Sequence, residues 1–182
     1  MTSTAAPFGL KPVFHPSGVI RQKDGVIASG YATAIFKGSP VKEGTDGSIQ
    51  AAAVGDRLVG AFVGCEYTAN GRRNIANYWP ASTVSADAVC YYTADADIVY
   101  AVQCAGTVPA TAVGEHADFA AVTGSTSTGL STASMSATIA TTTAQLAIHG
   151  LHKLQDNAWG DSYTVVLVRI AEHQYTASPA GY

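Results

Sequence analysis

The chain has 182 residues, of which 47% are hydrophobic and 13% charged. This length fits a single domain, since domains usually hold roughly 100–200 residues, and the apolar share is too high for a disordered chain. The net charge is −3, and the ten Lys and Arg residues are scattered along the sequence. No strongly basic surface is expected, so nucleic acid is excluded as the predicted partner.

The apolar residues do not gather into a membrane span. No uninterrupted apolar run approaches the roughly 18 residues that cross a bilayer, and the first residues lack the basic flank and apolar stretch of a secretory signal. We therefore expect a soluble protein that is not exported and has no membrane partner. Cys65, Cys90 and Cys104 show no CxxC spacing. They predict buried thiols in a reducing compartment, with neither a disulfide framework nor a zinc site.

Residues 1–18 predict an extended arm, because Pro7, Pro12 and Pro16 disfavour both a helix and regular strand pairing. The arm is nevertheless strongly apolar, and so short a segment cannot bury its side chains within itself. Burying each of them elsewhere would contribute about 1.5–3 kcal/mol. We expect the arm to lie on another protein, and its removal to leave the remaining domain folded. The candidate interface residues are Phe8, Leu10, Pro12, Val13 and Phe14.

Short strands are predicted after the arm. Val26–Phe36, Ser48–Val54 and Leu58–Tyr67 are rich in β-branched or small apolar residues, and clusters of Gly, Pro, Ser and Asp separate them. The strongest hairpin signal is Asn70-Gly71, since both residue types accept a positive φ. Three further segments shape the second half of the chain, and each predicts a different element.

The segment Ile98–Cys104 alternates in the pattern of a strand with one buried face, whereas Tyr163–Ile170 is apolar on both faces and predicts a central strand. Between them, Thr123–Thr143 is rich in Ser and Thr and predicts a long surface loop or an edge hairpin. Together these patterns predict a mainly β protein, a jelly-roll-like sandwich or barrel, in which residues 19–182 form one domain behind the N-terminal arm.

Catalytic and cofactor signatures are missing: the sequence has no GxGxxG, GxxxxGK[ST], GxSxG or HExxH motif and no calcium loop. Three clusters offer weaker possibilities. They are His149-x-x-His152 with Asp156 for a metal, Glu115-His116-x-Asp118 for a general base, and Asp95-Ala96-Asp97 for calcium. In each, the spacing or the number of ligands falls short of the chemistry required, so solvated surface roles are favoured. We predict no catalytic residue, no metal site, no cofactor and no enzymatic activity.

Large aromatic residues offer a further possibility. Trp79 and Trp159 could form a platform for stacking sugars, but aromatic residues embedded in apolar strands more often belong to a core or a subunit interface. We therefore assign Trp79, Trp159 and Tyr163 as core or subunit-interface candidates.

Five segments, spread in order along the chain, carry a likeness to a known family: Ala6–Gly18 (APFGLKPVFHPSG), Gly30–Lys42, Val54–Arg73, Asn77–Ala81 and Asn157–Tyr175. They resemble small structural proteins of tailed bacteriophages, the head decoration or capsid cement proteins. The first segment is similar to the FGL(K/R)PV start of these proteins. These are packing and turn motifs, so the resemblance carries no active site.

The resemblance implies a β-rich protein, often trimeric, on the outer surface of the virion head, assembled in the bacterial cytoplasm. Its partner would be the major capsid protein, whose neighbouring subunits it would clamp after the shell expands. The apolar arm would lie along capsid proteins or add to the edge of a capsid sheet. Two other functions remain open: a glycan-binding β-sandwich module and a structural protein of the phage tail.

Overall fold

The computed structural model describes residues 4–140 and 142–176. The chain is mainly β, as predicted, and its strands form several antiparallel sheets. A jelly-roll strand order stays a prediction. The described helical structure is one 3₁₀ turn, η1 (Ala110–Ala112), and among these residues no helix is long and apolar enough to cross a membrane.

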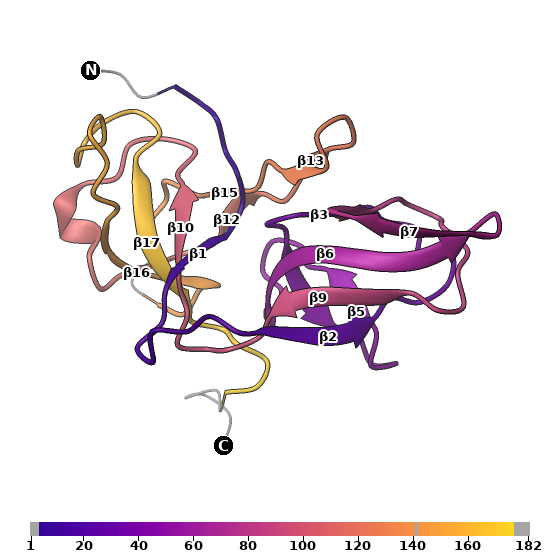
Figure 1. Ribbon diagram of the computed structural model, residues 1–182. Coiled ribbons are helices and arrows are strands. Elements are labelled where there is room, and N and C mark those ends of the chain that lie inside the picture. The colour runs from indigo at the N-terminus through magenta and orange to yellow at the C-terminus, as the bar shows by residue number, and fades with distance from the viewer. Residues whose placement is uncertain (1–3, 141, 177–182) are drawn as a thin grey trace.

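The first sheet lies on the left of Figure 1 and has β17 near its centre. Its strands, in spatial order, are β1 (Lys11–Phe14), β10 (Val99–Gln103), β17 (Val165–Ile170), β16 (Leu146–Leu151) and β11 (His116–Ala117). A two-stranded pair packs beside it, made of β12 (Phe119–Ala121) and β15 (Ser134–Met135). Their buried side chains form one hydrophobic core.

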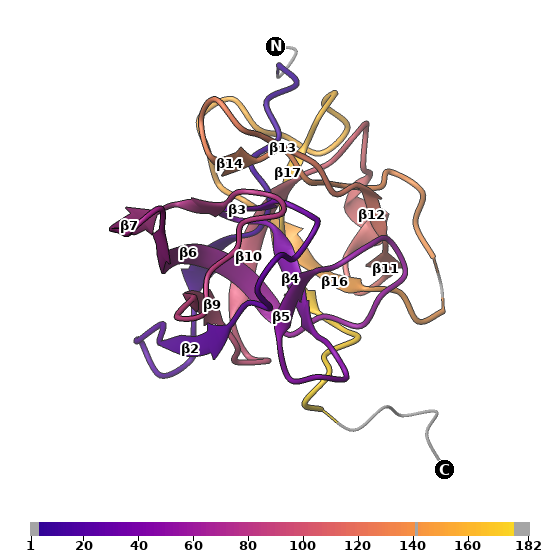
Figure 2. The ribbon, with the colours of Figure 1, turned by 90° about the vertical axis from the view of Figure 1, so that its right-hand side faces the viewer.

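The second sheet lies on the right of Figure 1 and faces the viewer in Figure 2. Its strands, in spatial order, are β2 (Gln22–Val26), β9 (Val89–Thr93), β6 (Gly60–Ala69), β4 (Pro40–Glu43) and β5 (Ile49–Ala51), with β7 (Arg72–Ala76) also paired to β6. Two short pairs complete the strands: β3 (Ile35–Phe36) with β8 (Tyr78–Trp79), and β13 (Gly124–Ser125) with β14 (Leu130–Ser131). A second hydrophobic core packs against this sheet. We call the first sheet with its core the first lobe, and the second sheet with its core the second lobe.

Local turn chemistry accounts for the β6–β7 hairpin. Asn70 and Gly71 have φ values of 52° and 71°, and the strands pair from Ala69 opposite Arg72. Two successive positive φ values give a turn whose twist matches that of the flanking strands. The predicted hairpin is therefore confirmed.

Two predicted strands differ from the structure. Most of Val26–Phe36 is irregular, because the chain leaves the sheet after β2 and is held by bonds such as Gly30 N–H to the Thr83 carbonyl (2.8 Å). All residues of β10 are buried, although the alternation predicted one exposed face. On the second face, the Gln103 side chain bonds the N-terminal segment: it accepts from Ala6 N–H and donates to the Thr4 carbonyl.

The N-terminal segment belongs to the first lobe. Strand β1 pairs with β10, and Leu10 is only 1% exposed, inside the first core. Backbone bonds secure this position: Gly9 N–H donates to the Ala133 carbonyl (3.1 Å) and Leu10 N–H to the Gly38 carbonyl (2.8 Å). The expectation of an arm separate from the domain at residue 18 is thus corrected, because distant parts of the same chain shelter Leu10. Residues 1–3 of the predicted arm lie outside the described residues.

The Ser/Thr-rich segment is partly a hairpin and partly core. β13 and β14 form the hairpin that projects beside β3 in Figure 1. The chain then turns inward, and Ala133 and Met135 are both 0% exposed in the first core. The prediction of a surface hairpin is therefore confirmed only for its first part. Thr141 of this segment lies outside the described residues.

Hydrogen bonds from glutamine side chains to backbone groups join the two lobes. Gln145, which is 0% exposed, donates its amide hydrogens to the carbonyls of Ala53 (2.9 Å) and Asp56 (2.8 Å), and its Oε1 accepts from Phe119 N–H (3.2 Å). Gln174 makes a similar clamp on β4, bonding both the N–H and the carbonyl of Glu43. The Phe119 N–H is buried, so loss of the Gln145 side chain would leave this group without a partner.

Candidate interaction surface

The two sheets share a continuous edge on one side of the molecule. β1 is the outermost strand of the first sheet and β2 that of the second, and residues 15–21 connect them directly (Figure 1). This edge carries exposed apolar side chains: Val13 is 42% exposed, Phe14 55% and Val19 56%. Val13, Phe14 and Val19 thus form an exposed apolar strip along this edge.

A bulge explains why these side chains point outward. Pro12 lies opposite Tyr100 and Phe14 opposite Val99, so Val13 has no partner of its own on β10. In a regular strand Phe14 would share the face of Leu10 and Pro12, four and two residues before it. An extra residue breaks that alternation and turns the strand. Leu10 therefore points into the core while Phe14 remains exposed.

An apolar groove of about 810 Å³ lies beside this edge. It is formed by residues from distant parts of the sequence, and its larger apolar members include Phe8, Ile20, Phe62, Leu130 and Leu154. Lys11, Lys37 and His152 also line it, whereas none of its lining residues is a carboxylate. The groove therefore combines apolar surface with positive charge.

The five predicted interface residues divide into three groups. Leu10 borders the groove but is only 1% exposed and packs in the chain's own core, which corrects its assignment as a residue that a partner contacts. Phe8 and Pro12 are half-buried and line the groove. Val13 and Phe14 are exposed on the bulged strand. The residues that complete the groove from elsewhere in the chain carry no local signal, so the sequence analysis did not find them.

The aromatic candidates occupy different environments. Trp79 is 0% exposed in the second core, where its ring meets that of Tyr67 edge to face at 5.2 Å. Trp159 is half-buried against the first core, and Tyr163 is half-buried with a φ of 58°. Because Trp79 is inaccessible, the sugar-stacking platform predicted for the glycan alternative loses one of its two tryptophans.

The acidic candidates are engaged in local bonds. The Asp118 carboxylate accepts from Gln145 N–H (3.0 Å), and that of Asp95 accepts from Asp97 N–H (2.9 Å) and pairs with His15 (3.1 Å). The bond from Asp97 is the main reason that the pKa of Asp95 is lowered. His149 is exposed on β16. Within residues 4–140 and 142–176, no group of three or more His, Cys, Asp or Glu side chains could hold a metal ion.

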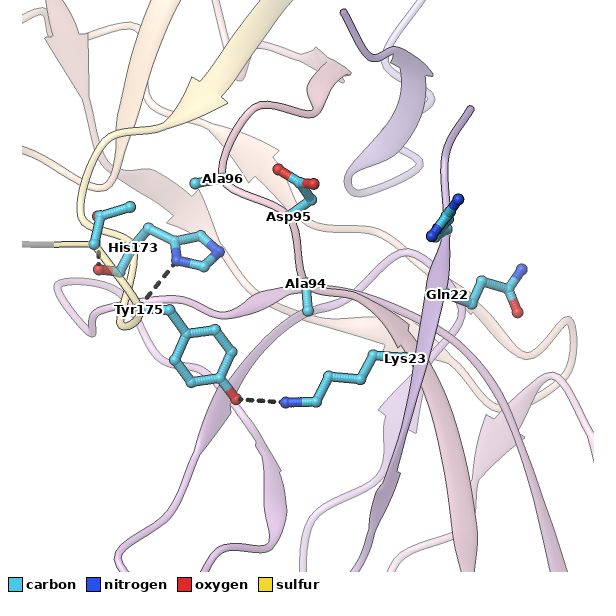
Figure 3. A pocket seen from close by; sticks show the side chains of 9 residues that line it. Gln22, Lys23, Ala94, Asp95, Ala96, His173 and Tyr175 are labelled. Atoms are coloured by element: carbon cyan, nitrogen blue, oxygen red, sulfur yellow. Dashed lines mark hydrogen bonds between the residues drawn. The ribbon is translucent and has the colours of Figure 1, made fainter. Parts of the chain in front are cut away.

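A small pocket of about 360 Å³ lies between residues 173–176 and the start of β2 (Figure 3). His173 is 1% exposed at this pocket, its Nδ1 accepts from Tyr175 N–H (3.1 Å), and burial lowers its pKa. Lys23 donates to the Tyr175 hydroxyl (3.4 Å), which itself donates to the Glu43 carboxylate. Burial and the bond to Glu43 raise the pKa of Tyr175. These contacts fix the C-terminal segment to β2 and β4.

No family model, curated protein or solved structure matches the chain. A functional assignment therefore depends on the surface described above and on the sequence resemblance of its N-terminal segment.

Proposed function

We propose that this chain is a decoration protein of a tailed-phage head, which binds the outer surface of the shell and stabilises contacts between major capsid subunits. The observation that carries the proposal is the exposed pair Val13 and Phe14, held beside the apolar groove. This pair lies inside Ala6–Gly18, the segment that resembles the opening of the decoration proteins. An exposed apolar strip beside a groove is typical of a surface that binds another protein.

The proposed mechanism involves binding without chemistry. A protein that binds only the assembled, expanded shell stabilises that state over its dissociated subunits by mass action. If the chain forms a trimer, as we also propose, one docked copy holds its neighbours close to their own sites and raises their effective concentration. Modest affinity at each edge strand would then give firm attachment.

Co-sedimentation with undecorated expanded heads, assembled from the major capsid protein of the same genome, tests the proposal. The variant combines Val13→Ser with Phe14→Ser, and Ile75→Ser is the matched control because Ile75 is an 81% exposed apolar residue on β7. Losing two apolar contacts of about 1.5 kcal/mol each should weaken binding by about a hundredfold. The control should bind as the wild type does.

Two results would contradict the proposal. If the wild-type chain fails to sediment with expanded heads, or sediments with tails instead, the assignment to the head is wrong. If the double variant binds as well as the wild type, the bulged edge strand is not the attachment surface. Unexpanded heads form the second control, since the proposal expects weaker binding to them.

A further inference from the structure

Two of the three cysteines face each other across neighbouring strands. Cys65 on β6 lies directly opposite Cys90 on β9 in the antiparallel ladder. The two side chains are 1% and 0% exposed in the second core, and all three cysteines of the chain are free thiols. Cys104 lies in the first core and belongs to a different cluster.

The spacing of the two strands suits a disulfide. Directly opposed residues of an antiparallel pair have Cα atoms about 4.5–5.5 Å apart, which falls inside the range of about 4.4–6.8 Å found across disulfides. In the reduced protein the sulfur atoms face different neighbours. Cys65 donates to the Tyr78 carbonyl (3.4 Å), whereas the Sγ of Cys90 lies 3.4 Å from where a Cβ of Gly25 would stand. Forming the bond therefore requires rotation of the side chains.

Burial protects these thiols while the second lobe is closed. It raises the pKa of both Cys65 and Cys90 to about 12, so little thiolate is present near neutral pH. The neighbour of Cys90 on β2 is Gly25, and the side chains of Ile49 and Tyr92 fill the place where its Cβ would stand, so access to Cys90 requires movement of β2. β2 is an edge strand whose other four residues are exposed. Opening of such a strand is a low-energy fluctuation that would admit a small reagent.

We propose that Cys65 and Cys90 form a cross-strand disulfide when the folded protein meets a small-molecule disulfide. One cysteine thiolate attacks a sulfur of the reagent, forming a mixed disulfide and releasing one small thiol. The second cysteine attacks the protein sulfur of that mixed disulfide and releases the other small thiol. The two protein thiols thereby lose two protons and two electrons, and the reagent gains both. The new bond joins β6 to β9 and closes the chain around the β7 hairpin.

Peptide mapping after treatment with hydroxyethyl disulfide tests the proposal on the whole protein. Remaining thiols are alkylated, and a protease specific for Asp separates Cys90 from Cys104, since Asp95 and Asp97 lie between them. We expect one crosslinked pair of peptides containing Cys65 and Cys90, sensitive to dithiothreitol, with Cys104 alkylated. The intact mass should fall by that of two hydrogen atoms. The same treatment in urea shows that the reagent oxidises these thiols when they are exposed.

Three results would overturn the proposal: all three thiols surviving treatment of the folded protein, crosslinks that involve Cys104, or stable mixed disulfides in place of a crosslink. The variant Cys104→Ala provides a control, because it should retain the crosslink completely. If the disulfide stabilises the pairing of β6 with β9, the denaturation midpoint should rise on oxidation and return on reduction. A midpoint that falls on oxidation would show that the bond distorts the core and would contradict this stabilisation.

Discussion

The substitution Leu10→Ala tests whether β1 is an integral part of the fold. Leu10 is 1% exposed and packs in the first core, so its truncation removes buried methyl groups and leaves a cavity. Such substitutions cost about 2–5 kcal/mol of unfolding free energy. Phe14→Ala is the matched control, because Phe14 is 55% exposed on the same strand and its truncation should cost less than about 1 kcal/mol.

Unfolding in urea measures this difference. A loss of about 2–5 kcal/mol is a large part of the 5–15 kcal/mol typical of natural domains, and it lowers the melting temperature by roughly 2–4 °C per kcal/mol in a chain of this size. Trp159 packs against the first core and Trp79 lies in the second, so tryptophan fluorescence reports on both lobes. Circular dichroism at the same urea concentrations reports on the strands.

The refuting result is equal stability of Leu10→Ala and the wild type. It would show that β1 does not dock on the first lobe in solution, and the free arm expected from the prolines would be restored. A variant lacking residues 1–18 cannot replace this comparison. It removes core contacts and the proposed attachment residues together, so a loss of shell binding would not reveal which of them mattered.

Three further outcomes follow from buried contacts. Gln145→Leu removes two bonds to the carbonyls of Ala53 and Asp56 and leaves the buried N–H of Phe119 without a partner, so we expect a loss of about 2 kcal/mol or more in urea unfolding. A loss below about 1 kcal/mol would contradict the clamp. Burial lowers the pKa of His173 below 6.5, so the folded state binds fewer protons than the unfolded state, and the stability should fall as the pH drops below about 6.5. His173→Phe should flatten this dependence of stability on pH, measured by denaturation from pH 7.5 to about 5. An unchanged slope would show that His173 does not cause it. A Cβ at Gly60 would stand 1.5 Å from the Thr93 carbonyl oxygen, whereas one at Gly150 meets nothing within 4 Å. Gly60→Ala should therefore cost more than about 3 kcal/mol and Gly150→Ala stay within about 0.5 kcal/mol, as thermal melts would reveal.

Features set by short-range chemistry could be predicted from the sequence. The Asn70-Gly71 turn needs only two residues that accept positive φ, and its hairpin was found where expected. The apolar run Tyr163–Ile170 predicted a central strand, and β17 lies between β10 and β16. In both cases the deciding physics is contained in a few adjacent residues, so no knowledge of distant partners is needed.

Features set by partners distant in sequence could not be predicted in this way. The prolines of the N-terminal segment argued against pairing, yet β1 pairs with β10, because an edge strand needs hydrogen bonds on one side only. The groove depends equally on distant segments, since Ile20, Phe62 and Leu154 meet there only after the two sheets have packed together. A local pattern identifies an apolar residue but does not say which surface will cover it.

The edge strand also limits how a partner can bind. Exposed strand edges invite pairing with other chains, and natural proteins block them with lysines, prolines and bulges. β1 contains all three: Lys11, Pro12, which has no N–H to donate, and the bulge at Val13. A regular ladder added to this edge would be interrupted at its centre. Attachment through β1 therefore favours insertion of the Val13 and Phe14 side chains into an apolar site on the partner over the addition of a strand.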